Sequence, residues 1–217
     1  MMQAQEQFSC SLREHVDKLD FLNWYRFFFI FKAALAARPE TVLEIGAGSG
    51  VVKSCLLPHV KEYRTMDVNK NLAPDFLQDV REARPELDGK FDLVIIADVL
   101  EHIPFADLPR ALEAIRSYLK PGGTLLATIP HRRSYFLFMT PNYVPRVAAV
   151  PTGFLSFGSF YRRFIKRKIW IDPDHCWEIG DGHIKRGDVE NAIDAAGFTA
   201  RSRKSLLYVD FWIVKKP

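Results

Sequence analysis

The sequence has few cysteines and no cysteine pair of the kind that holds a metal. Its 217 residues contain three, Cys10, Cys55 and Cys176, and no two of them form a C-x-x-C pair. An odd and widely spaced set argues against a disulfide framework and suits the reducing cytoplasm, where we expect the protein to lie. Internal repeats and low-complexity tracts are absent too, and 48% of the residues are hydrophobic. We therefore expect one domain, residues 1–217, with a substantial core.

A long uninterrupted hydrophobic run is also missing. The most apolar stretch, residues 21–37, is broken by Arg26 and Lys32 and follows several acidic residues. It is too short and too charged to span a bilayer, and cleavage behind it as a signal peptide would leave the first core strand at the new terminus. We interpret it as an amphipathic, largely buried helix within an N-terminal cap, residues 1–39.

Acidic residues are scarce in one part of the chain. The net charge is +4, but residues 132–186 hold ten Lys and Arg against four Asp and Glu, so this part carries +6 and the remainder −2. Such an uneven distribution predicts a local basic surface, and it is not typical of a protein that coats nucleic acid.

Elsewhere, strand-like and helix-like segments alternate. We expect strands at 41–46, 61–67, 73–79, 91–97 and 124–130, helices at 51–58, 106–120 and 188–196, and final strands at 198–203 and 206–214. Alternation of this kind predicts an α/β fold with a doubly wound, mostly parallel sheet. Residues 40–130 would form its core and 187–217 its C-terminal helix and strands. The aromatic and basic residues 131–186 would be an insertion after the fifth strand.

The first predicted strand ends in the glycine-rich turn "LEIGAGSG". A dinucleotide site has the pattern G-x-G-x-x-G, but Val51 stands where its third glycine belongs, and the carboxylate of Glu44 would repel a diphosphate. S-adenosylmethionine carries a positive sulfonium, a ribose and an adenine without phosphate, so acids at the strand ends suit it better. Asp67 and Asp79 end the next two predicted strands, where an acid reaches ribose hydroxyls or an exocyclic amine.

Four segments, "VLEIGAGSG", "TMDVNKNLAPDFLQDV", "KFDLVIIADVLEHIP" and "LKPGGTLLATIP", resemble the class I S-adenosylmethionine-dependent methyltransferases in order and spacing. The resemblance covers roughly residues 40–130, with a weaker similarity at "DVENAIDAAGF", and it implies a Rossmann-like sheet with an antiparallel last strand. A helix usual in the family is reduced to "VNKNLAP" here. The implied cofactor contacts are the methionine side at Glu44, Gly46, Gly48 and Gly50, the ribose at Asp67 with Val68, the adenine at Asp79 with Val80, and the methionine side again at Ala97 and Asp98.

Methyl transfer is an in-line displacement, so a general base is optional and depends on the acceptor. His131 directly follows the fifth predicted strand, which places it at the carboxyl edge of the sheet as a candidate base and acceptor contact. The alternative is a histidine hydrogen-bonded within a loop. Glu101 and His102 are interpreted as a structural pair, and no metal site is expected because no residues have a recognised ligand spacing. Further candidate acceptor contacts are Tyr135, His175 and Trp177.

Segment 153–170, within the insertion, separates its side chains on a helical projection. On one side lie Phe154, Phe157, Phe160, Tyr161, Phe164 and Ile165. On the other lie Arg162, Arg163, Lys166 and Arg167, and Lys168 departs from this separation. Such a helix binds an anionic membrane through its aromatic face, or it serves as a lid over the acceptor, and the two roles are compatible.

The sequence thus predicts a methyltransferase that uses S-adenosylmethionine and acts on a small or lipophilic acceptor. It would be cytoplasmic, or peripheral to the inner face of the membrane through segment 153–170. The alternatives are a non-catalytic S-adenosylmethionine-binding regulatory or assembly protein and, with less support, an NAD(P)-dependent oxidoreductase. A nucleic-acid substrate is not expected, because "DVLE" follows the strand "FDLVIIA" where a DPPY-like or NPPY-like tetrapeptide would indicate methylation of bases.

Overall fold

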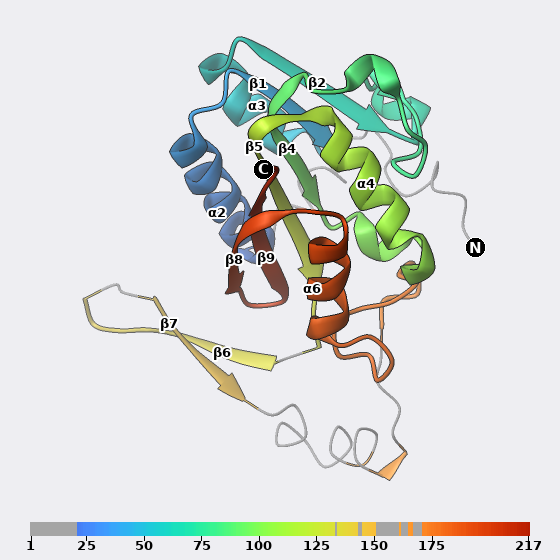
Figure 1. Ribbon diagram of the computed structural model, residues 1–217. Coiled ribbons are helices and arrows are strands. Elements are labelled where there is room, and N and C mark those ends of the chain that lie inside the picture. Colours follow the sequence, from blue (N-terminus) through green and yellow to red (C-terminus); the bar gives the residue numbers. More distant parts are fainter. Residues whose placement is uncertain (1–20, 133, 143–144, 151–160, 162–164, 167–170) are drawn as a thin grey trace.

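The computed structural model describes residues 21–132, 134–142, 145–150, 161, 165–166 and 171–217 (Figure 1). Within them, the α-helices are α2 (Phe21–Ala37), α3 (Val51–Leu56), α4 (Leu108–Tyr118) and α6 (Arg186–Ala195). The strands are β1 (Thr41–Ile45), β2 (Glu62–Asp67), β3 (Phe76–Leu77), β4 (Phe91–Ala97), β5 (Leu119–Pro130), β6 (Ser134–Met139), β7 (Pro145–Val150), β8 (Thr199–Ser205) and β9 (Val209–Lys215). Short 3-10 turns follow several of them: η1 (Leu57–His59), η2 (Lys70–Leu72), η3 (Pro85–Leu87), η4 (Leu100–His102) and η5 (Phe105–Asp107).

The main sheet has seven strands in the order β3-β2-β1-β4-β5-β9-β8. The first five pair in parallel, whereas β9 lies antiparallel between β5 and β8. This arrangement confirms the predicted doubly wound, mostly parallel sheet with an antiparallel last strand. The strand β4 has the predicted bounds, and Val94, Ile95 and Ile96 are fully buried, as a central strand covered on both faces requires.

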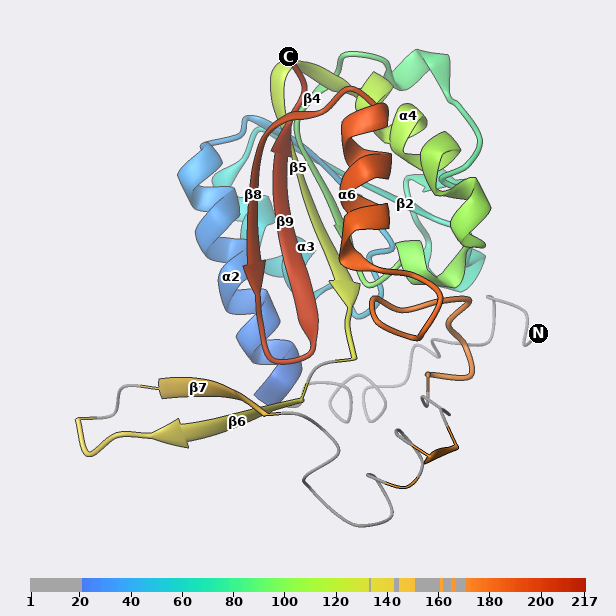
Figure 2. The same cartoon turned by 60° about the horizontal axis from the view of Figure 1, so that its bottom comes forward.

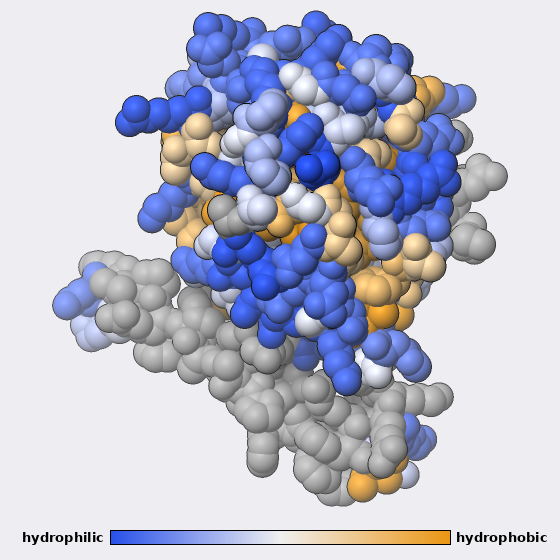
Figure 3. All heavy atoms as spheres, in the orientation of Figure 1, coloured by the Kyte–Doolittle hydropathy of each residue, from blue (hydrophilic) through white to orange (hydrophobic). Residues whose placement is uncertain are grey.

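Helices cover both faces of this sheet (Figures 1 and 2). Apolar residues of α2 and α3 pack with one face of β1, β4 and β9, and those of α4 and α6 pack with the other face. Alternate residues of one strand enter opposite clusters: Leu93 and Ile95 pack toward α2, whereas Val94 and Ile96 pack toward α4. Figure 3 shows that the outer surfaces of α4 and α6 are mainly hydrophilic.

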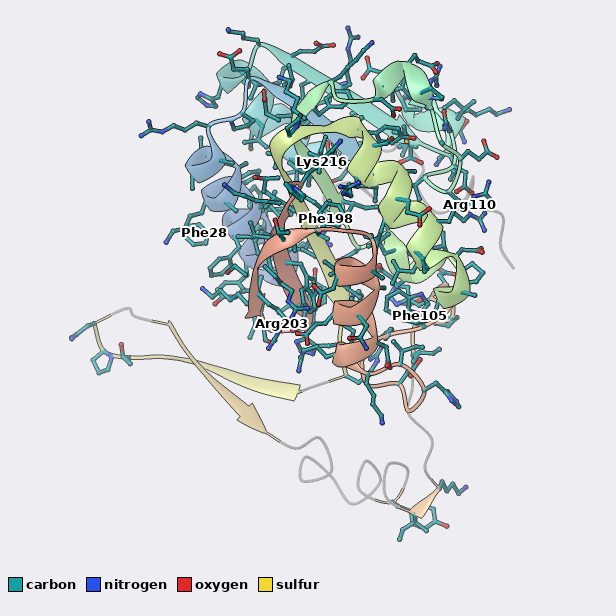
Figure 4. All side chains as sticks on the ribbon, viewed as in Figure 1. Phe28, Phe105, Arg110, Phe198, Arg203 and Lys216 are labelled. Atoms are coloured by element: carbon teal, nitrogen blue, oxygen red, sulfur yellow. The ribbon has the colours of Figure 1, made fainter. Side chains whose placement is uncertain are left out.

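The helix α2 has the predicted bounds, but it is less buried than the sequence suggests. Phe27, Ile30 and Ala34 are buried against the sheet at spacings of three and four residues. Trp24 and Phe28, in contrast, are 47% and 56% exposed, and Figure 4 shows Phe28 on the outer side of the helix. The apolar run therefore wraps most of the helix, while the sheet covers only one side of it. No helix in the described part of the chain is long and apolar enough to cross a membrane.

The insertion contains an element that the sequence did not predict. Strands β6 and β7 form an antiparallel hairpin, paired from Ser134 with Val150 to Met139 with Pro145, and this two-stranded sheet extends away from the main sheet (Figure 1). Neither strand shows the alternation of polar and apolar residues that identifies a strand, because β6 reads SYFLFM and β7 reads PRVAAV. The helix expected for segment 153–170 lies outside the described residues, apart from Tyr161, Ile165 and Lys166.

Candidate functional site

A cleft of about 330 Å³ opens at the carboxyl ends of the parallel strands. It lies where the strand order reverses between β1 and β4, the position at which doubly wound sheets bind ligands. Three strand ends contribute acids to it, Glu44 from β1, Asp67 from β2 and Asp98 after β4. Other predicted residues in its lining are Gly46, Gly48, Val68, Ala97 and His175.

The turn between β1 and α3 forms the floor of the cleft, and its shape requires glycine. Gly46, Gly48 and Gly50 have φ angles of 76°, 47° and 72°, in the left-handed region that other residues avoid. A Cβ atom on Gly46 would lie 2.2 Å from Cγ2 of Val99. Gly50 itself does not line the cleft, but its neighbours Ser49 and Val51 do. The turn thus leaves bare backbone where a ligand would lie.

Glu44 is almost completely buried at the end of β1. The hydroxyl of Tyr63 donates a hydrogen bond to Oε2 of Glu44 over 2.8 Å. Burial raises the pKa of Glu44 to about 8, so the side chain holds its proton in the ligand-free protein near neutral pH. A cation in the cleft would favour the ionised form, because opposite charges lower a carboxyl pKa. Burial also raises the pKa of Asp67, whose Oδ1 accepts a hydrogen bond from the backbone of Asn69.

Asp98 links the strand β4 to the helix α2. Its carboxylate forms an ion pair with Arg26, and the hydroxyl of Thr128 donates to it over 2.5 Å. Arg26 also donates to Asn23, and both α2 residues line the cleft. Sequence reasoning missed Asn23 and Arg26 as site residues. The available signal was the charge of Arg26 within an apolar run, since a buried helix tolerates such a charge only when it is paired.

Asp79 and Val80, the predicted adenine contacts, do not line the cleft as far as the described residues form it. The strand β3 ends at Leu77, and the side chain of Arg81 holds both oxygens of Asp79 at 2.9 and 2.6 Å. The same hydrogen bonds lower the pKa of Asp79. Val80 is 5% exposed and belongs to the core beneath α4. Arg81 therefore holds the carboxylate of Asp79, and the core holds the side chain of Val80.

His131, the predicted base, is a core residue at the end of β5. It is 4% exposed, and its Nε2 lies 3.2 Å from the carbonyl oxygen of Leu206 and 3.9 Å from Asp210. Burial lowers the pKa of His131. Topology placed this residue at the correct edge of the sheet, but the turn between β8 and β9 covers it. The structure thus matches the alternative of a hydrogen-bonded structural histidine, and His131 does not reach the cleft.

The other predicted acceptor contacts have three different outcomes. His175 lines the cleft together with His102, and their rings are 4.8 Å apart in an edge-to-face arrangement. Trp177 is 2% exposed and donates its indole N–H to the carbonyl of Ile103, so it anchors a loop and does not face a ligand. Tyr135 belongs to β6, and its side chain lies outside the described part of the structure.

Comparisons with protein families and curated proteins agree with this geometry. A family model described as a methyltransferase domain matches residues 21–202. The ubiquinone biosynthesis O-methyltransferase of Xanthomonas campestris is 32% identical over 154 residues, which is 63% of this chain and 61% of that protein. The chondramide synthase cmdD of Chondromyces crocatus is 31% identical over 109 residues, 42% of this chain and 3% of the synthase. The chain thus spans less than two thirds of the length of these relatives.

Solved structures with a similar fold are more distant in sequence. The 1,6-didemethyltoxoflavin-N1-methyltransferase of Burkholderia thailandensis aligns with a TM-score of 0.54 and 16% identity, covering 94% of this chain and 84% of that chain. The N-methyltransferase NodS of Bradyrhizobium japonicum aligns with a TM-score of 0.56 and 15% identity, covering 92% and 89%. At these identities, the likeness shows the shared fold.

Proposed function

Because the chain belongs to the class I S-adenosylmethionine-dependent methyltransferase family, whose domain model matches residues 21–202, we propose that it transfers a methyl group to a small organic acceptor. The proposal rests on the cleft at the switch point of the sheet, where a left-handed glycine turn and three carboxyl groups meet. The bare backbone at Gly46 is a cradle that a Cβ would fill, and it fits the methionine part of the cofactor. Carboxyl groups around it fit a cation and disfavour a diphosphate.

When bound, the cofactor supplies a methyl group on a positively charged sulfur. The chain contributes position and charge: Asp67 stands at the end of β2, where a carboxylate accepts hydrogen bonds from ribose hydroxyls. Glu44 lies beneath the glycine turn and would ionise next to a positive ligand. The helix α2 closes one side of the cleft through Arg26 and so limits the access of water. These residues hold the reacting atoms in line, which is most of what this reaction requires.

The acceptor class is inferred from the relatives and from the cleft. One similar protein is named for O-methylation in ubiquinone biosynthesis, and another for N1-methylation of 1,6-didemethyltoxoflavin. Both names refer to the chemistry of small organic molecules. The cleft of about 330 Å³ lies in the range of small-molecule sites, and the proposed cofactor would itself fill part of it. We infer that the acceptor is a small molecule, with lipophilic character if segment 153–170 contributes to its pocket.

The function is tested by binding first and by turnover second. In calorimetry, S-adenosylmethionine is expected to bind and NAD is not, because the turn lacks the glycine spacing of a dinucleotide site. Purified protein with methyl-labelled cofactor is then incubated with cell extract separated into lipid, small polar and macromolecular pools. Label in the lipid pool or in the small polar pool supports the proposal. Label in the macromolecular pool alone would overturn the acceptor class, and binding without labelling of any pool would favour a non-catalytic regulatory protein.

Asp67→Ala is expected to weaken S-adenosylmethionine binding by about 1–3 kcal/mol, the scale for leaving buried hydroxyl groups without their acceptor. Calorimetry measures the change directly. Asp75→Ala is the matched control, because Asp75 accepts hydrogen bonds from Thr65 on the same strand β2 and does not line the cleft. An unchanged affinity of Asp67→Ala would remove Asp67 from the ribose site.

We further propose that segment 153–170 binds anionic membrane surfaces and places the protein at the inner face of the membrane. Tyr161 and Ile165 support this, being 41% and 62% exposed next to basic neighbours. Vesicles containing anionic lipid are expected to sediment the protein at low salt and release it at high salt. Each basic residue contributes about 1 kcal/mol. Replacing Arg162, Arg163, Lys166 and Arg167 by Gln should abolish binding, whereas replacing the exposed Arg38, Lys61, Lys70 and Lys90 should not. If both sets of substitutions changed vesicle binding equally, segment 153–170 would not be the membrane-binding element, and the lid would be the remaining interpretation.

A further inference from the structure

Glu101 is a buried carboxyl group whose hydrogen bonding is incomplete among the described residues. It is 0% exposed, and neither of its carboxyl oxygens meets a hydrogen-bond donor from another residue in the described part of the chain. A buried polar group of this kind is costly and uncommon unless a ligand completes its bonding. The proposed methyl transfer leaves this group unexplained.

Two imidazoles face Glu101 from the cleft. One ligand atom each of Glu101, His102 and His175 lies within 4.8 Å of the others. Nε2 of His175 is 3.9 Å from Oε1 of Glu101, too far for a hydrogen bond between them. Both histidines line the cleft, whereas Glu101 is buried behind them.

The hydrogen bonds of both histidines leave the second nitrogen available. Nδ1 of His102 lies 3.0 Å from the carbonyl oxygen of Asp174, which can only accept, so this nitrogen carries the proton. Nδ1 of His175 lies 2.8 Å from a carboxyl oxygen of Glu178 and donates to it in the same way. In each ring, Nε2 therefore keeps a free lone pair. Metal-binding histidines characteristically hold their other nitrogen by such a carbonyl or carboxylate.

The loop with His175 is tied firmly to the turn with Glu101 and His102. The backbone N–H of Cys176 donates to the carbonyl of Glu101 over 2.7 Å, and its thiol lies 3.3 Å from the carbonyl of His102. The indole of Trp177 reaches the carbonyl of Ile103 over 2.9 Å. The three candidate ligands are thus held together before any ion arrives, as a specific site requires.

We propose that Glu101, His102 and His175 bind a divalent transition-metal ion at the edge of the cleft. Nitrogen and oxygen ligands lie about 2.0–2.2 Å from such an ion, so ligand atoms around it are separated by up to about 4 Å. A small rotation of the side chains closes the present spacing to that value. The ion would supply the partner that Glu101 lacks.

The ligand set selects the class of metal. Two imidazoles and one carboxylate suit zinc, iron, cobalt or manganese, and they lack the thiolates that a soft metal prefers. Three protein ligands leave a coordination position open, as in catalytic metal sites. Because both histidines line the cleft, that position faces the acceptor side, where a hydroxyl or carboxylate oxygen of a small molecule fits it. Binding of the ion does not depend on methyl transfer.

The sequence predicted no metal site, and the cluster shows why spacing did not reveal it. The turn of His102 and the loop of His175 contact each other across 72 to 74 residues of chain. A local ligand pattern could not exist at that separation. Glu101 and His102 were interpreted as a structural pair, and only His175 was expected near the acceptor.

The test uses the full chain, freed of affinity tags and of bound metal by chelation. Zinc is titrated by calorimetry, and cobalt by its visible absorption, which reports ligand geometry. One ion is expected per chain. Glu101→Gln, His102→Asn and His175→Asn should each weaken binding more than about 100-fold, since losses of supporting residues alone cost 10–100-fold. His59→Asn, at an exposed histidine outside the cleft, should bind like the unaltered protein.

Circular dichroism and S-adenosylmethionine calorimetry on the metal-free variants separate folding from ligation. Glu101→Gln keeps the shape of the side chain, so the variant should fold and bind the cofactor. If it does not fold, the two histidine variants, at half-buried positions, provide the test. Failure of the unaltered protein to bind one ion, or equal binding by all variants, would overturn the metal site even if methyl transfer is demonstrated. A protein that binds the ion but no S-adenosylmethionine would instead contradict the proposed function.

Discussion

Gly46→Ala is expected to destabilise the fold by about 2–5 kcal/mol and to abolish S-adenosylmethionine binding. Alanine in the left-handed conformation costs about 1–2 kcal/mol, and overpacking of a tight site costs about 1–3 kcal/mol more. Both apply here, because the φ angle is 76° and the new Cβ would meet Val99 at 2.2 Å. Relief of the clash must move either Val99 or the turn, and both line the cleft.

Chemical denaturation measures the stability and calorimetry the affinity. Gly89→Ala is the control: its φ angle is 64°, and no described atom lies within 4 Å of the added Cβ. It should cost only the conformational part, about 1–2 kcal/mol, and leave the affinity unchanged. A Gly46 variant that is no less stable than the Gly89 variant and binds the cofactor normally would show that the floor of the cleft is not constrained as described.

Arg26→Ala should cost about 3 kcal/mol in stability and lower the cofactor affinity at least tenfold. The side chains of Arg26 and Asp98 are only 11% and 20% exposed, and removing one partner of such a buried pair leaves the other charge uncompensated. The pair also fixes α2 against the end of β4, so its loss opens one side of the cleft.

A double-mutant cycle with Asp98→Ala isolates this interaction. The double variant should lose clearly less stability than the sum of the two single losses, because the second substitution removes the charge that the first left unpaired. Lys32→Ala, at an exposed position on the same helix, should have little effect. Additive losses would mean that α2 is held by its apolar contacts alone.

The central part of the fold was predictable because its signals are local. The strand β4 is a continuous apolar run, and α2 is bounded by the break at Arg38 and Pro39, so both have the predicted limits. The glycines and acids at the ends of β1, β2 and β4 were found because they are adjacent to those strands. Parallel topology then brings such residues to one edge without further information.

The remainder depends on which partner each side chain meets, and several of these partners are distant in the chain. The ion pair of Arg26 with Asp98 joins positions 72 apart in the chain. His131 was expected in the cleft, but the turn before β9 buries it through Leu206. Asp79 was expected at a strand end, yet Arg81, two residues away, holds its carboxylate. Sequence reasoning identified which side chains carry charge, but not which partner each one meets.

The position of β9 also bears on how the protein folds. This strand, which follows the other described strands in sequence, lies between β5 and β8, and its Phe211 and Trp212 are buried in the clusters on opposite faces of the sheet. Neither layer is complete without those residues, so both faces of the sheet keep apolar surface uncovered until β9 is in place. Deleting β9 would therefore remove apolar contacts from both layers at once, and the remaining chain should not fold.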